Sequence, residues 1–130
     1  MRWLCRVKGM NRFICIAALF ASVTPVFAGK ADVLDAKATR DADGTYTFSV
    51  TVKADDTGWD KYADRWEVVA KDGTVLGVRV LAHPHENEQP FTREQSGIAV
   101  PPGTSDVTIR AHDKVEGFGG AEFKLVLPPQ

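Results

Sequence analysis

Apolar and polar residues alternate in short runs from Ala31 onward, and turn-forming residues separate the runs. A period of two residues is typical of strands with one buried face, and no stretch keeps the period of a helix. The first two runs are joined by the turn at residues 41–44, which predicts a β-hairpin. The apolar positions of these runs are Leu34, Ala36 and Ala38, then Tyr46, Phe48, Val50 and Val52.

Five later runs continue the same alternation. Their apolar positions are Trp66, Val68 and Ala70; Leu76, Val78 and Val80; Ile98 and Val100; Val107, Ile109 and Ala111; and Phe123, Leu125 and Leu127. A tight turn at residues 71–74 predicts direct pairing of the third and fourth strands. We therefore predict an all-β fold, a single seven-stranded antiparallel β-sandwich over residues 29–130, with one sheet ordered four-three-six-seven.

Seven short strands in about 100 residues resemble immunoglobulin-like and fibronectin type III-like sandwiches at the level of architecture. The likeness covers residues 31–128 and includes Trp66 on the third strand, but the tyrosine that commonly precedes the sixth strand is absent. The chain also resembles small exported bacterial proteins of unassigned function. Neither resemblance implies a particular activity.

Three long connections are expected at one end of this fold. If the strands run alternately up and down, residues 54–65, 83–96 and 113–120 meet at one pole, which we call the loop pole. The connections at the other pole are brief and built from ordinary turn formers. Long loops on a rigid scaffold are often functional, so we expect the loop pole to carry the function.

The first 28 residues have the order of a cleavable signal peptide: basic residues, an apolar run from Phe13 to Phe27, and a small residue at Ala28. The apolar run is too short to span a bilayer. Met1 and Met10 are alternative starts, and Cys15 lacks the small neighbour of a lipoprotein attachment site. We expect processing after Ala28 and a soluble periplasmic or secreted protein.

Removing the leader changes the charge and the chemistry. Four of the 16 Lys and Arg residues lie in residues 1–28, so 12 remain against 17 acidic residues, a net charge of −5. This acidic balance argues against nucleic acid as a partner. Both cysteines and both methionines also lie in the leader, so residues 29–130 contain no disulfide and no sulfur ligand.

The three histidines are the candidate metal ligands. His83 and His85 stand two residues apart, so on an extended segment both imidazoles point the same way, and His112 ends the sixth predicted strand at the same pole. Without sulfur ligands, copper(II) is expected before zinc(II). Additional oxygen ligands are available at Asp60, Asp64, Glu86 and Asp113. Histidines that cap loop carbonyls are the ordinary alternative.

Four aromatic residues complete the loop pole: Trp59, Tyr62, Phe91 and Phe118. They either form an interaction surface or fold inward to close the end of the sandwich. The acidic turn at residues 41–44 lacks the later ligands of a calcium loop and is interpreted as a turn.

No sequence motif of a known catalytic class is present in the chain. We expect an exported, non-catalytic module that binds another exported protein or a small ligand at the loop pole, with a divalent metal at the histidines as an added hypothesis. A glycan-binding domain with an aromatic platform and a small metalloenzyme are the alternatives.

Overall fold

The computed structural model describes residues 29–130, which form seven strands and no helix. The predicted signal peptide, its cysteines and both possible start residues lie outside the described residues. In the described part, no helix could span a membrane. The strands are β1 (Asp32–Arg40), β2 (Tyr46–Lys53), β3 (Ala63–Val69), β4 (Val75–Val80), β5 (Phe91–Ile98), β6 (Asp106–Asp113) and β7 (Phe123–Val126).

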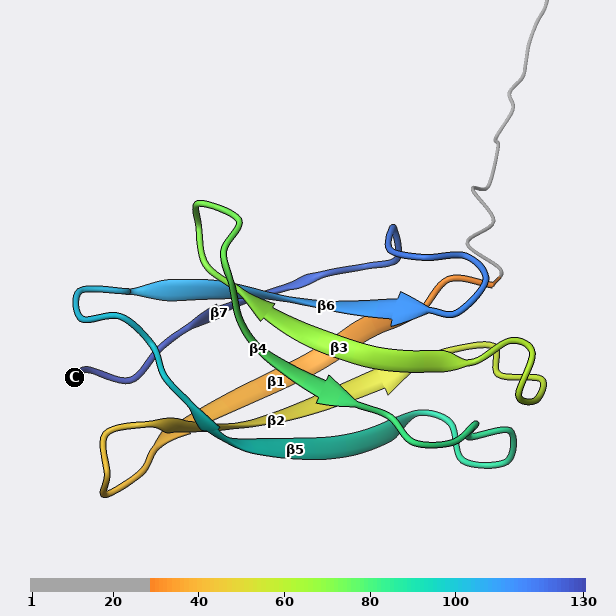
Figure 1. Ribbon diagram of the computed structural model, residues 1–130, viewed down its shortest axis with the longest axis horizontal. Helices are drawn as coiled ribbons and strands as arrows, with labels where there is room; N and C mark the ends of the chain where they lie inside the picture. Colours follow the sequence, from red (N-terminus) through yellow and green to blue (C-terminus); the bar gives the residue numbers. More distant parts are fainter. Residues whose placement is uncertain (1–28) are drawn as a thin grey trace, which may run out of the picture.

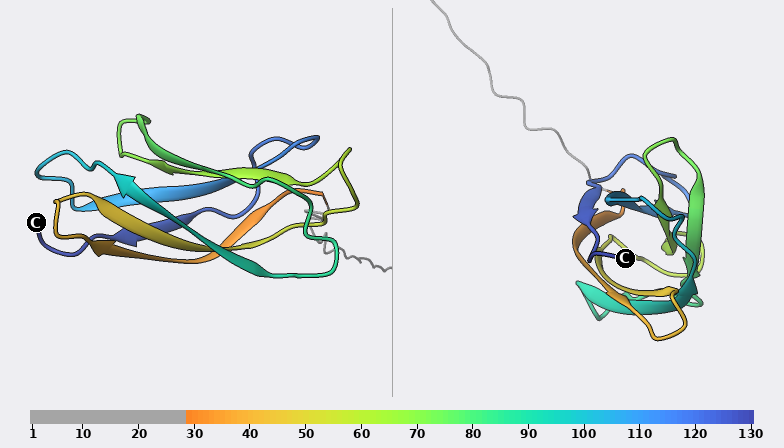
Figure 2. Two further views of the ribbon diagram at one scale, coloured as in Figure 1. Left: turned by 60° about the horizontal axis from the view of Figure 1, so that its bottom comes forward. Right: turned by 90° about the vertical axis from the view of Figure 1, so that its left-hand side faces the viewer.

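The strands form two antiparallel sheets that face each other (Figure 1). One sheet has the order β1-β2-β5 and the other β4-β3-β6-β7, so the predicted order of the second sheet is confirmed. The connections β2–β3, β4–β5 and β6–β7 share one pole, and the C-terminus lies at the opposite one (Figure 2). The predicted loop pole is therefore present.

The core lies between the sheets and follows the alternation of the sequence. All four apolar positions of β2 are buried, and Trp66 and Val68 of β3 are fully inaccessible. Each large apolar side chain buried in this way contributes roughly 1.5 to 3 kcal/mol. The buried apolar residues of both sheets form one cluster, which holds residues 29–130 together without a disulfide.

Glycines bring the two sheets close at both edges. A side chain at Gly120 would collide with the backbone carbonyl of Ala31, and one at Gly77 would collide with Ile98 of β5. Near Gly120, the Val33 backbone nitrogen donates to the carbonyl of Ala121 at 2.8 Å. The β6–β7 loop is therefore fastened to the start of β1.

Two register shifts correct the predicted strands. The β1–β2 pairing shifts between Val33 and Asp35, so Val33 is buried and Leu34 is 48% exposed. The β3–β4 pairing shifts as well, and Val78 lies opposite the outward-facing Glu67. Residues opposite each other in paired strands share a face, so Val78 points outward. Val80, two residues further along the strand, points the same way. A bulge moves side chains to the other face, which simple alternation does not predict.

The prediction of a loop at residues 83–96 is wrong in its second half. Phe91–Ile98 is a strand that pairs with β2 from Phe91 opposite Val52 to Ile98 opposite Tyr46. Between its apolar ends β5 carries polar residues, and Arg93 and Gln95 take half-buried positions that apolar residues usually fill. The connection from β4 to β5 therefore spans only residues 81–90.

Candidate functional site: the loop pole

The β2–β3 loop presents a tryptophan on a short hydrogen-bonded turn. The Lys61 backbone nitrogen donates to the carbonyl of Gly58 at 3.1 Å, and the Thr57 nitrogen donates to the carbonyl of Lys61 at 3.0 Å. Trp59 sits at the tip of this turn and is 62% exposed. The backbone of the turn is thus fixed while the indole faces water.

The β6–β7 loop braces this turn from the side. Lys114 donates from Nζ to the carbonyl of Trp59 at 2.8 Å and from its backbone nitrogen to the carbonyl of Tyr62 at 2.9 Å. The rings of Trp59 and Tyr62 meet edge to face with centroids 5.8 Å apart. Glu86 of the β4–β5 loop lies beside Gly58, and Asp60 is exposed next to Trp59. All three loops therefore contribute to the surroundings of Trp59.

A buried ion pair underlies the pole. Asp113 is fully buried and accepts from Lys61 Nζ at 2.8 Å, while its other oxygen accepts from the backbone nitrogens of Val115 and Glu116. Burial alone would raise the pKa of Asp113, but the hydrogen bonds from Lys61 and the two amides outweigh it and hold the pKa below its ordinary value. Asp113, a candidate metal ligand, is thus already satisfied by protein donors.

His85 is buried beneath the β4–β5 loop. Its ring stacks on Phe91 with centroids 3.9 Å apart, and its Nε2 lies 3.0 Å from Nη2 of Arg93. Because a guanidinium only donates, Nε2 is the acceptor and the neutral ring carries its proton on Nδ1. Nδ1 has no hydrogen-bond partner among the described residues; Asp56 Oδ2 is 3.9 Å away. Burial, with the nearby charge of Arg93, lowers the pKa of His85.

The backbone around His85 joins two loops. Asp56 accepts from the His85 backbone nitrogen and from the Ala63 nitrogen, each at 2.9 Å. Gln89 also donates to the carbonyl of His85 and accepts from the Ala54 nitrogen. The β2–β3 and β4–β5 loops are therefore held as one unit.

The three histidines do not form one cluster. The ring of His83 is exposed and lies 4.6 Å from that of His85, but His112 stands on the outer face of the four-stranded sheet, with Nδ1 2.7 Å from Asp64. Over residues 29–130, no group of three or more His, Cys, Asp or Glu side chains is placed to hold a metal ion. Metal binding stays a prediction, and its geometric support is limited to the pair of His83 and His85.

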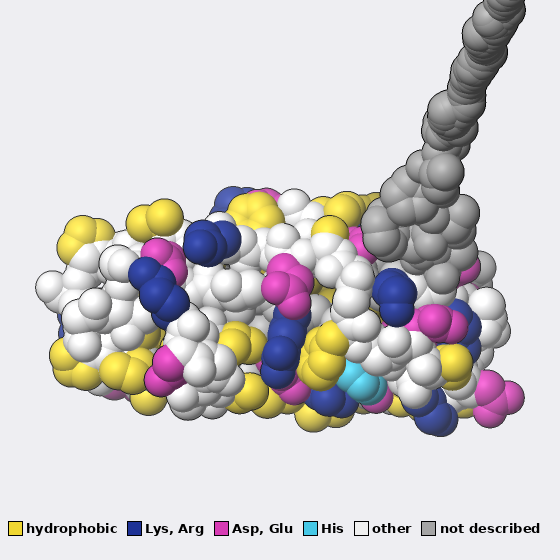
Figure 3. Space-filling model, turned by 90° about the horizontal axis from the view of Figure 1, so that it is seen from above, with side chains coloured by type: hydrophobic (Ala, Val, Ile, Leu, Met, Phe, Trp, Pro, Cys, Tyr) yellow, Lys and Arg dark blue, Asp and Glu magenta, His cyan; other side chains and the backbone are white. Residues whose placement is uncertain are grey.

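A charged network on the outer face of the four-stranded sheet was not anticipated from the sequence. Glu67 accepts from Arg65 Nε at 2.9 Å and from Arg110 Nη2 at 2.8 Å. The Phe118 ring covers the Arg110 guanidinium, with 4.2 Å between the ring centroid and Cζ. Figure 3, seen from the side of this sheet, shows charged side chains of both signs together with a histidine. Burial would raise the pKa of Glu67, but the two arginines hold it below its ordinary value. The sequence signal that could have revealed this network is the set of polar residues that alternate with the buried apolar residues of β3 and β6.

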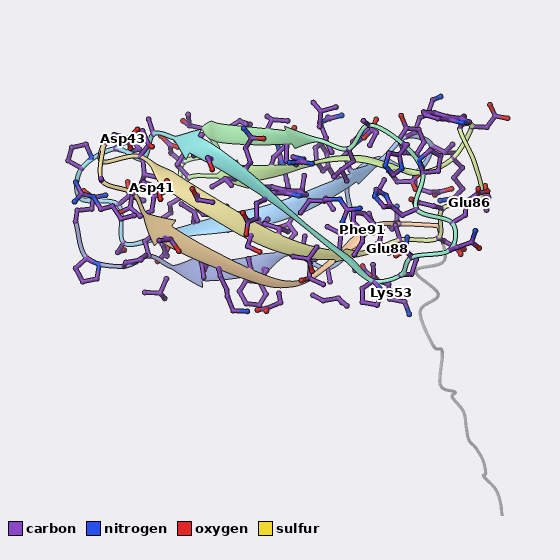
Figure 4. All side chains as sticks on the ribbon, turned by 90° about the horizontal axis from the view of Figure 1, so that it is seen from below. Asp41, Asp43, Lys53, Glu86, Glu88 and Phe91 are labelled. Carbon is purple, nitrogen blue, oxygen red and sulfur yellow. The ribbon has the colours of Figure 1, made fainter. Side chains whose placement is uncertain are left out.

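The aromatic residues divide between the two interpretations. Phe91 is buried and closes the end of the sandwich, while Phe118 covers the arginines and Tyr62 is half-buried. Only Trp59 of the four is strongly exposed. Figure 4 shows Phe91 with Glu86 and Glu88 at the loop pole.

The acidic turn lies at the opposite pole, where Figure 4 labels Asp41 and Asp43. Asp43 accepts from both the backbone and the hydroxyl of Thr45, and the Gly44 nitrogen donates to the carbonyl of Asp41. The interpretation of residues 41–44 as a turn is confirmed.

Comparison with known proteins gives one informative match. The chain is 49% identical over 73 residues to a protein of Halomicrobium mukohataei described as "Putative lipoprotein", an alignment that covers 56% of this chain and 35% of that protein. The chain thus aligns with about a third of its relative's length. No family model and no solved structure matches the chain.

Proposed function

We propose that this chain is an exported, non-catalytic binding module that holds another protein of the cell envelope at the loop pole, with Trp59 as the anchor. The observation that carries the proposal is the 62% exposure of Trp59 on a turn fixed by backbone hydrogen bonds. Exposed tryptophan is unfavourable in water and is enriched among the residues that dominate protein interfaces. A fixed turn also loses little conformational freedom on binding.

The surroundings of Trp59 support a protein partner. Asp60, Glu86 and Lys114 place charges of both signs around the indole, which is the arrangement of an apolar centre within a polar rim. A glycan platform needs several exposed rings, and Phe91 is withdrawn into the core. The glycan alternative therefore rests on Trp59 and the half-buried Tyr62.

Export and fold type complete the proposal. The leader-like residues 1–28 and the description of the relative as a lipoprotein both support an exported protein, periplasmic or secreted. The pairing of β1-β2-β5 with β4-β3-β6-β7 supports an immunoglobulin-like fold. A copper(II) or zinc(II) ion at His83 and His85 would be an addition to this function and is not required for it.

Site-specific crosslinking in living cells tests the proposal. A photoreactive phenylalanine analogue at position 59 of the full chain should give one dominant protein adduct after irradiation. The control position is Val126, which is 75% exposed and lies near the opposite pole. If position 59 gives no more adduct than position 126, the proposal fails. If adducts form only with saccharide, the glycan alternative replaces it.

A further inference from the structure

Gly29 is fixed to the loop pole although it is the first described residue. It is buried, and its carbonyl accepts from Lys61 Nζ at 2.7 Å. The same Lys61 nitrogen pairs with the buried Asp113 at 2.8 Å. The chain therefore enters the fold beside the ion pair that underlies the Trp59 turn.

Glu116 lies directly against Gly29. A Cβ atom at Gly29 would meet Cγ, Cδ and Oε2 of Glu116 at 3.0, 3.2 and 3.4 Å. Gly29 also has a φ of 97°, a conformation that glycine adopts without strain. Both observations explain why glycine occupies this position.

The Glu116 side chain is exposed and lies beside Gly29. Lys61 is used by Asp113, and among the ion pairs within residues 29–130 none includes Glu116. An amide nitrogen at residue 29 is neutral. A positive charge on the nitrogen of residue 29 would lie close to the Glu116 carboxylate.

We propose that cleavage after Ala28 supplies this charge, and that the new α-ammonium group of Gly29 pairs with the Glu116 carboxylate. This inference rests on the processing expected from the sequence. Water cleaves the Ala28–Gly29 amide bond: its hydroxyl completes the carboxyl group of Ala28, and its hydrogen goes to the nitrogen of Gly29, which takes a further proton from solvent. Free α-amino groups have a pKa of about 7.7 to 8.0, so this group is mostly charged at neutral pH.

The pair would couple processing to the binding surface. Glu116 belongs to the β6–β7 loop, whose Lys114 braces the turn of Trp59. The pairing would therefore add a further link between this loop and the mature N-terminus.

Titration of the α-amine tests the proposal on protein exported from the full gene. Intact mass first establishes whether the chain begins at Gly29, and ¹³C-glycine NMR then follows the Gly29 Cα signal with pH. The pKa of the α-amine should be raised by about half a unit in the wild type. It should return to its ordinary value in Glu116→Gln and remain raised in the control Glu122→Gln, which removes an exposed charge from the residue before β7.

The outcomes separate the two ideas. A mass that shows a different N-terminus overturns the processing and the pair together. The correct mass with an ordinary α-amine pKa in the wild type, or an equal pKa in wild type and Glu116→Gln, overturns the pair and leaves the function proposed for Trp59 intact.

Discussion

Individual side chains explain the charged network of the four-stranded sheet. The Glu67 side chain is only 9% exposed, so its charge requires strong partners, and Arg65 and Arg110 provide them. The alternation that buries Trp66 and Ala111 places Glu67 and Arg110 opposite each other on the outer face. The network therefore follows from the same register that builds the core.

Replacing Glu67 by glutamine should lower the free energy of unfolding by about 1 to 3 kcal/mol, because the charge-assisted bonds to two arginines are lost. Urea unfolding at pH 7 measures this, with the exposed Glu94→Gln as the control, expected within about 0.5 kcal/mol of wild type. Folding lowers the pKa of Glu67. The difference in unfolding free energy between wild type and Glu67→Gln should therefore shrink as the pH falls through the ordinary glutamate range. Equal stabilities at pH 7 would disprove the structural role of the network.

At the scale of elements, the strands with large alternating apolar residues were predictable and the others were not. β2, β3 and β6 follow their apolar positions because burial of those side chains decides the register. β5 was predicted too late in the chain, at Ile98 and Val100, because Arg93 and Gln95 occupy its half-buried positions. The bulge at Leu34 depends on how β1 meets β2, which no local pattern contains.

The candidate site was predictable in the same uneven way. The sequence predicted that the three long connections share one pole, since strand order and alternating direction determine this. It did not predict which side chains of this pole contact one another. His112 points to the outer face while His85 stacks on Phe91, so residues at one pole form separate groups.

The β4–β5 loop should loosen at acidic pH because His85 is buried in its neutral form. Protonation would place a positive charge on His85, beside Arg93 and close to His83. The negative charges of Glu88 and Asp56 favour the protonated ring, but their effect is smaller. Folding lowers the pKa of His85, so the unfolded chain binds the proton more readily. The stabilisation is present above a pH of about 6.5 and is lost as the pH falls below it.

Unfolding free energies at pH 7.5 and 5.5 measure this effect, and amide exchange of residues 81–90 locates it. The drop between the two pH values should be smaller in His85→Gln than in wild type. In His83→Gln, which removes only the exposed neighbour of His85, the drop should decrease less. An equal drop in wild type and His85→Gln would show that His85 is not responsible.

The whole molecule is a two-sheet scaffold with an unequal pair of ends. Short turns close the pole that holds the C-terminus, while the other pole gathers three loops and Gly29 (Figures 1 and 2). Close approaches at Gly77 and Gly120 hold the sheets together at both edges. This rigidity allows the loops to present Trp59 in one fixed position.

Isothermal titration tests the central claim most directly. It compares the affinity of wild type and of Trp59→Ala for the partner identified by crosslinking, which is purified separately. Loss of an interface anchor costs about 2 kcal/mol or more, so the Kd should rise roughly thirtyfold or more in Trp59→Ala. Val126 is also apolar and exposed, but it lies near the other pole, so Val126→Ala should bind within about twofold of wild type. A Trp59→Ala protein that keeps the wild-type fold and binds the partner with wild-type affinity would contradict the assignment of the loop pole as the binding surface.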